Sequence, residues 1–126
     1  MWIAVIEFKQ FSDDADRLFS REELESLKNL LAINPEVGTV IPGTGGIRKL
    51  RVPLERKGKG KRGGARVIYF YFSDDLPVAL LAVYSKGEKI DLSASDKKEL
   101  RTLVDEYVRE HKERRGKRSR DIKIIR

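Results

Sequence analysis

The chain has no cysteine and only one histidine, His111, among its 126 residues. Disulfides and thiolate chemistry are therefore excluded, and a zinc site is not expected. No run of about 18 apolar residues occurs, so no transmembrane helix is expected. The first residues lack the basic segment of a signal peptide, and Glu7 interrupts their apolar run early. These absences predict a small cytoplasmic protein with one core and with neither a metal nor another cofactor.

Positive charge is abundant and is gathered in two segments. Residues 48–66 contain nine Lys or Arg against one acid, Glu55, so their net charge of +8 exceeds the +7 of the whole chain. Residues 109–126 carry nine basic and three acidic groups, a net +6, and the rest of the chain is net −7. A net-acidic body with two basic segments indicates directed binding of a polyanion, and the phosphate backbone of a nucleic acid is the expected one.

The N-terminal patterns predict a strand followed by two helices. Residues 2–8 are rich in β-branched and aromatic side chains, which is typical of a strand. Ser12, followed by two acids, predicts the N-cap of a short helix. Ser20 and Glu23 have the spacing of a capping box, and leucines then recur on one helical face until residue 34. The Gly- and Pro-rich residues 35–46 predict a loop.

Three further strands and a final helix complete the predicted domain. Residues 47–53 alternate between apolar and basic side chains, and the apolar run 65–73 predicts a central strand covered on both faces. Residues 78–85 would complete an antiparallel meander. Residues 93–96 predict the cap of a last helix with an apolar stripe from Leu100 to Val108. The order βααβββα predicts an α+β domain with its helices packed on one face of the sheet.

The C-terminal end differs in composition from the rest. The apolar stripe stops near His111, and a strongly basic stretch follows. We therefore predict one domain over residues 1–112 and a basic tail over residues 113–126, which is too polar to bury and is expected to fray on its own.

Three segments carry a resemblance to a known family. They read GTGGIRKLR at residues 43–51, RVIY at 66–69 after a basic Gly-rich hairpin, and YSKGEKIDL at 84–92. With the order of elements, they resemble the HigB branch of the RelE/ParE toxins over residues 8–103. The resemblance implies a RelE/ParE-like fold and a ribosome-dependent mRNA interferase of a type II toxin–antitoxin system. It also implies a helix-turn-helix antitoxin of the HigA type, contact with operator DNA only through that antitoxin, and no membrane.

Cleavage of RNA through its own 2′-OH requires an aligned phosphate, stabilisation of the charge on the phosphorane and two proton transfers. Basic side chains can stabilise the phosphorane charge without a metal. By its match to the family pattern, Arg66 is assigned to the scissile phosphate. Lys49 is assigned to proton transfer or charge stabilisation, and Arg51 and Lys86 to supporting phosphate contacts. The predicted activity is that of a metal-independent endoribonuclease.

Other basic residues are expected to bind the RNA backbone without taking part in the chemistry. Glycines alternate with cations in the loop between the second and third predicted strands, which allows close approach to phosphates. The predicted backbone contacts are Arg48, Lys57, Lys59, Lys61 and Arg62.

Two questions stay open at the level of the sequence. The group that transfers a proton or stacks on a base could be Lys49, Tyr69, Tyr84 or Ser93. The function could instead be that of a ParE-like DNA gyrase inhibitor, which shares the fold, or of a non-enzymatic RNA-binding module.

Overall fold

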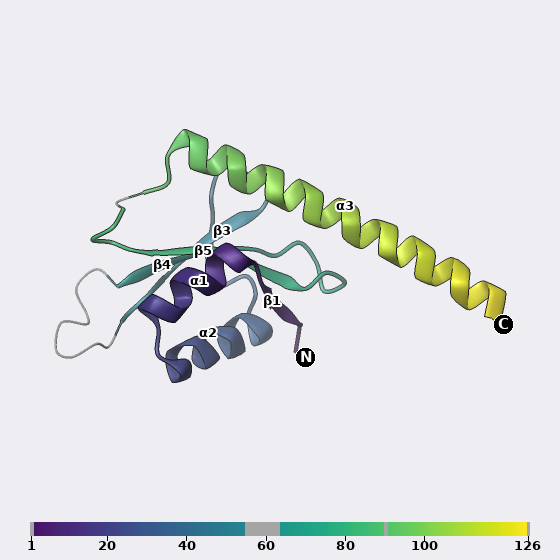
Figure 1. Cartoon of the computed structure of the whole chain (residues 1–126), viewed down its shortest axis with the longest axis horizontal. Helices are drawn as coiled ribbons and strands as arrows, with labels where there is room; N and C mark the ends of the chain where they lie inside the picture. Colours follow the sequence, from purple (N-terminus) through teal and green to yellow (C-terminus); the bar gives the residue numbers. More distant parts are fainter. Residues whose placement is uncertain (1, 55–63, 90, 126) are drawn as a thin grey trace.

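The computed structural model describes residues 2–54, 64–89 and 91–125, with side chains through Lys112. Its elements follow the chain in the order β1 (Val5–Glu7), α1 (Lys9–Leu18), α2 (Arg21–Ile33), β2 (Thr39–Val40), β3 (Ile47–Val52), β4 (Ala65–Phe70), β5 (Val78–Ser85) and α3 (Ala94–Ile125) (Figure 1). The predicted α+β fold is confirmed. The predicted RNA contacts at residues 57–62 lie outside the described residues.

The sheet has five strands in the order β1-β5-β4-β3-β2. Strands β3, β4 and β5 form the predicted antiparallel meander. Two features were not predicted: β1 pairs with β5 in parallel, and β2 pairs with β3 through Thr39 opposite Lys49. Strand β2 has only two residues, which is too short for an alternating pattern to show within the predicted loop.

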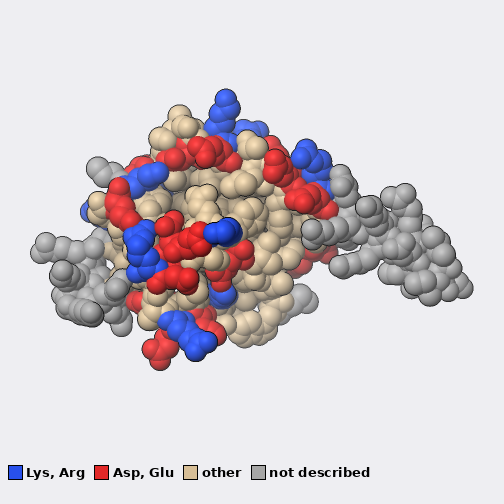
Figure 2. Space-filling view, in the orientation of Figure 1, with Lys and Arg blue, Asp and Glu red and all other residues tan. Residues whose placement is uncertain are grey.

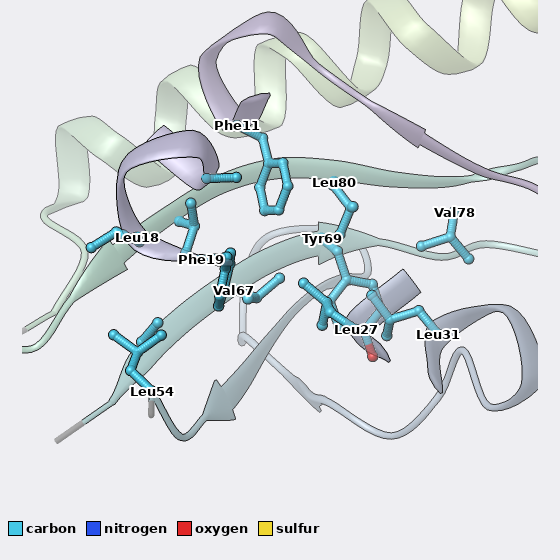
Figure 3. Packing of buried hydrophobic residues seen from close by; sticks show 13 residues of the cluster. Phe11, Leu18, Phe19, Leu27, Leu31, Leu54, Val67, Tyr69, Val78 and Leu80 are labelled. Atoms are coloured by element: carbon cyan, nitrogen blue, oxygen red, sulfur yellow. The ribbon is translucent and has the colours of Figure 1, made fainter. Parts of the chain in front are cut away.

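Helices cover both faces of the sheet, whereas the sequence predicted them on one. On one face, α1 and α2 pack on Val67 and Tyr69 of β4 (Figure 3). On the other, Leu100 of α3 packs in a second core with Ile68 and Phe70. All six residues of β4 are buried. The prediction that this central strand is covered on both faces is thus confirmed, and that double burial itself requires a helix on each side.

The two predicted N-caps near the start of the chain differ in outcome. The Ser20 capping box is confirmed, because the Ser20 N–H donates to Glu23 Oε1 at 2.8 Å and the Glu23 N–H to Ser20 Oγ at 3.1 Å. The predicted cap at Ser12 is wrong. Helix α1 already begins after Phe8, and the Ser12 hydroxyl donates to Glu7 Oε1 at 2.7 Å. An acceptor at the end of β1 therefore takes the hydroxyl away from the helix backbone.

Helix α3 starts as predicted but runs further than expected. Ser93 Oγ accepts from the Asp96 N–H at 3.0 Å, and Asp96 Oδ2 accepts from the Ser93 N–H at 2.9 Å. The backbone then stays helical through Ile125 and projects past the sheet (Figure 1), where the sequence predicted fraying. The division at residue 112 stays a prediction. In the part of the chain that is described, no helix is both long and apolar enough to cross a membrane.

Candidate nucleic-acid interface

The register of the meander brings Arg51, Arg66 and Tyr84 into one row across three strands. Arg51 lies directly opposite Arg66, and Arg66 lies directly opposite Tyr84. Opposed residues of an antiparallel pair project from the same face with their Cβ atoms about 4.5–5.5 Å apart. The row is on the α3 side of the sheet, because Tyr84 belongs to the core beneath α3. Arg51 is exposed, whereas Arg66 is buried with 8% of its surface accessible.

Lys49 lies on the same face, two residues before Arg51 on β3. Its Nζ is 3.5 Å from Oδ1 of Asp91, which follows 42 residues later in the chain. The Leu92 N–H, and after it the charge of Lys49, hold the pKa of Asp91 below its usual value. Lys49 is thus held by a carboxylate that another anion could replace. The sequence reasoning missed Asp91, and no local pattern pointed to it.

Lys86 follows the last residue of β5 and is exposed. Its N–H donates to the Gly64 carbonyl at 3.2 Å, so its backbone lies at the end of the sheet where β4 begins and Arg66 stands. Residues 57–62 come between Leu54 and Gly64 in the chain. Their predicted contacts with RNA stay predictions.

Arg48 does not join this group, because strand alternation turns it toward the opposite face. Its Nη1 donates to the carbonyls of Glu36 at 3.0 Å and Gly38 at 2.8 Å. Its Nη2 is 3.8 Å from the Glu36 carboxylate. Only 17% of the side chain is exposed. The guanidinium thus secures the segment that leads into β2, and we leave Arg48 out of the proposed RNA contacts.

The structure separates the two tyrosines between which the sequence could not choose. Tyr69 faces α1 and α2, where its hydroxyl donates to the Pro35 carbonyl and accepts from the Gly38 N–H, both at 2.8 Å. Tyr84 is in the row with Arg66. Its hydroxyl oxygen is buried and has no hydrogen-bond partner among the described residues. Burial, reinforced by the charge of Asp91, raises the pKa of Tyr84.

The remaining candidates have structural contacts. The Ser93 hydroxyl caps α3. His111 Nε2 is 3.1 Å from the Asp75 carbonyl, in the turn between β4 and β5 at the far end of β4 from Arg66. Within the described ranges, no group of three or more His, Cys, Asp or Glu side chains is placed to hold a metal ion.

Comparisons with known proteins give a likeness at the level of the fold. No sequence-family model matches the chain. A solved structure of a mutant of the E. coli toxin RelE in the free state superposes with a TM-score of 0.53. The match covers 71% of this chain and 90% of that one at 16% sequence identity. With its central meander and flanking helices, the chain therefore has a RelE-like fold.

Proposed function

We propose that the chain is a HigB-type toxin of a type II toxin–antitoxin module and that it cleaves mRNA on the ribosome. The observation that carries this proposal is the placement of Arg51 directly opposite Arg66 on one face of the sheet. The RelE-like fold and the resemblance of residues 43–51 to HigB toxins support it. The toxin would act in the cytoplasm and be neutralised by a HigA-type helix-turn-helix antitoxin, through which alone it would contact operator DNA.

The opposed arginines favour an anionic ligand. Two cations that project from opposed positions on one face of a sheet create a positive potential there, and a phosphate bound at the pair would be attracted by both. Guanidinium groups suit this role because each can donate two parallel hydrogen bonds to phosphate oxygens. Lys49 on the same face would add a further cation once its contact with Asp91 is exchanged for RNA.

These positions fit cleavage by the RNA's own 2′-OH. The 2′ oxygen would attack the phosphorus as its proton passes to a water molecule, forming a 2′,3′-cyclic phosphate. The bond to the 5′ oxygen would break, and that oxygen would take up a proton. Arg66, with support from Arg51 and Lys86, would bind the non-bridging oxygens and stabilise the phosphorane charge. Lys49 would stabilise that charge or donate the proton to the leaving oxygen.

The test is to substitute Arg66 by Ala and measure cleavage on programmed ribosomes by primer extension. Loss of one preorganised donor to a developing oxyanion lowers a rate by about 10²–10³. Ribosome affinity should fall far less, because it is spread over many cations. Arg21→Ala is the matched control, since Arg21 is an exposed arginine of α2 on the opposite side of the sheet. The control should cleave like the wild type.

Two outcomes would overturn the proposal. Equal cleavage by wild type and Arg66→Ala would remove Arg66 from the site. Absence of cleavage by the wild type, with or without ribosomes, would exclude the nuclease. Inhibition of DNA gyrase would then indicate a ParE-like function, and binding to RNA alone would indicate a non-enzymatic module.

A further inference from the structure

A groove lies between α1 and α3, where β1 no longer covers the edge of β5. Strand β1 pairs with β5 only through Val78–Leu80, and no described strand lies on that side of β5 further on. Ala82, Val83 and Tyr84 of β5 line the groove, together with residues of α1 and α3. The cavity has a volume of about 240 Å³, enough for one long side chain.

The walls of this groove are acidic, in contrast to the chain as a whole. Four acids, Asp14, Glu88, Asp96 and Glu99, line it with two cations, Arg17 and Lys89. The local charge is therefore −2 in a protein of net charge +7. Acidic side chains also gather over α1 on the visible face of the molecule (Figure 2).

The ion pairs within the groove leave an excess of negative charge. Arg17 bridges Asp14 and Glu88, and Lys89 Nζ is 2.7 Å from Asp96. Glu99 is exposed and forms no salt bridge with a described residue. A cation entering the groove would therefore meet the Glu99 carboxylate, which has only the more distant charge of Lys89 near it among the described residues.

The Tyr84 hydroxyl gives the groove a second unused polar group. Tyr84 lines the cavity, is only 7% exposed, and its hydroxyl oxygen has no hydrogen-bond partner among the described residues. Leaving such a group unpaired in a buried place is unfavourable, because its hydration is lost without a replacement. A ligand N–H reaching the phenol oxygen would remove this cost. The groove thus has among its lining residues a tyrosine with an unused buried hydroxyl and an exposed carboxylate, that of Glu99.

We propose that this groove binds an arginine side chain from an extended segment of a protein partner. The guanidinium would donate to the Glu99 carboxylate and the Tyr84 oxygen, and its methylene stem would lie along Leu92 and Leu100, which also line the groove. The backbone of the partner would run as an added strand along the edge of β5 beyond Leu80, which pairs with no described strand. RNA is disfavoured as the occupant because its phosphates would meet the net negative charge.

This site adjoins the proposed RNA contacts and does not require that the chain cleave RNA. Tyr84 is shared between the two, since it lies opposite Arg66 in the sheet and lines the groove. A partner bound here would therefore contact Tyr84, which lies at one end of the row of Arg51, Arg66 and Tyr84. It would be one strand away from Arg66.

The experiment is an NMR titration of the ¹⁵N-labelled full chain with a blocked Val-Arg-Val tripeptide. The control peptide carries citrulline, which has nearly the same shape as arginine but no charge. We expect saturable amide shifts at Val83, Tyr84 and Leu100 with the arginine peptide only. Glu99→Gln should weaken its binding by about twofold to fivefold, which corresponds to the loss of one exposed ion pair. Glu106→Gln, which neutralises another exposed acid of α3, should leave binding unchanged.

The inference fails if neither peptide shifts these amides, if citrulline binds as well as arginine, or if Glu99→Gln binds like the wild type. A third titration with guanosine monophosphate tests the nucleotide alternative. Shifts of the same amides by the nucleotide, without competition from the arginine peptide, would assign the groove to a base and overturn the proposal. The titration contains neither ribosome nor mRNA, so its result is independent of the cleavage assay.

Discussion

The two faces of the sheet use the same kinds of residue in opposite ways. On the face toward α1 and α2, Arg48 is held by two backbone carbonyls and the Tyr69 hydroxyl makes two hydrogen bonds. On the face toward α3, two arginines stand opposite each other and the Tyr84 hydroxyl has no partner among the described residues. Each face thus contains an arginine and a tyrosine, and on the first face the contacts of Arg48 and Tyr69 fix a neighbouring segment of the chain.

This contrast shows that alternation along β3 and β4 turns neighbouring residues toward different surroundings on the two faces of the sheet. Arg48 and Lys49 are neighbours in the chain, yet one secures the segment leading into β2 and the other contacts Asp91 near the basic row. Polar groups that satisfy each other contribute to stability, whereas a buried polar group without a partner among the described residues, such as the Tyr84 hydroxyl, lowers it. Proteins retain such unfavourable arrangements at functional sites.

The largest expected effect is on ribosome binding, and it concerns the basic residues 57–62 in the chain between β3 and β4. Replacing Lys57, Lys59, Lys61 and Arg62 by Ala should weaken ribosome binding and flatten its dependence on salt by about 3 units of slope, if each residue neutralises one phosphate. Binding is measured over a salt series with purified ribosomes. Substituting Lys9 and Arg21 in the α1 and α2 layer, both exposed, is the control and should leave the slope unchanged. An unaltered slope in the fourfold variant would exclude the loop from RNA binding.

A smaller effect is expected on the free energy of unfolding, and it distinguishes Tyr69 from Tyr84. Tyr69→Phe leaves the N–H of the buried Gly38 without its acceptor and should lower the free energy of unfolding by about 1–3 kcal/mol. Tyr84→Phe removes a hydroxyl that makes no such bond to any residue the structure describes, so its free energy of unfolding should equal or exceed that of the wild type. Denaturant unfolding of both variants is the measurement. Equal destabilisation would show that the Tyr84 hydroxyl also supports the fold.

Features encoded by short segments could be predicted from the sequence. The apolar run of β4, the meander and the Ser20 capping box each depend on neighbouring residues, and all three are present in the structure. The predicted cap at Ser12 was wrong because its hydroxyl bonds back to Glu7. The sequence could not predict which face of the sheet α3 covers. An apolar stripe shows that a helix packs on something, but the choice of face depends on contacts between segments that are distant in the chain.

In the candidate site, too, the residue types could be predicted from the sequence, whereas their arrangement in space could not. The resemblance to the RelE/ParE toxins pointed to Lys49, Arg51, Arg66 and Lys86, and the structure places the first three on one face of the sheet. The register that sets Arg51 against Arg66, the turning of Arg48 to the other face, and the contact between Lys49 and Asp91 all depend on strand pairing. Spacing along the chain contains no such information, and it could not distinguish Tyr69 from Tyr84 either.

The smallest expected effect compares the capping boxes of the two layers, since the one on the α3 side contains an additional ion pair. Asp96 accepts from the Ser93 N–H and also pairs with Lys89, and these contacts, with Lys89 first, lower its pKa to about 2. The unfolded value is about 3.9. Because the folded pKa is the lower one, the charged carboxylate stabilises the fold above about pH 4, and this contribution is lost as the pH falls toward 2.

Asp96→Asn keeps an oxygen for the cap but removes the charge. It should lower the free energy of unfolding at pH 7 by about 0.2–1 kcal/mol, the range for exposed ion pairs, and the difference from wild type should shrink between pH 4 and 2. Denaturant unfolding across this range measures it, with Asp105→Asn, another exposed acid of α3, as the control. A difference that persists at pH 2 would assign the stabilisation to the shape of the cap and not to its charge.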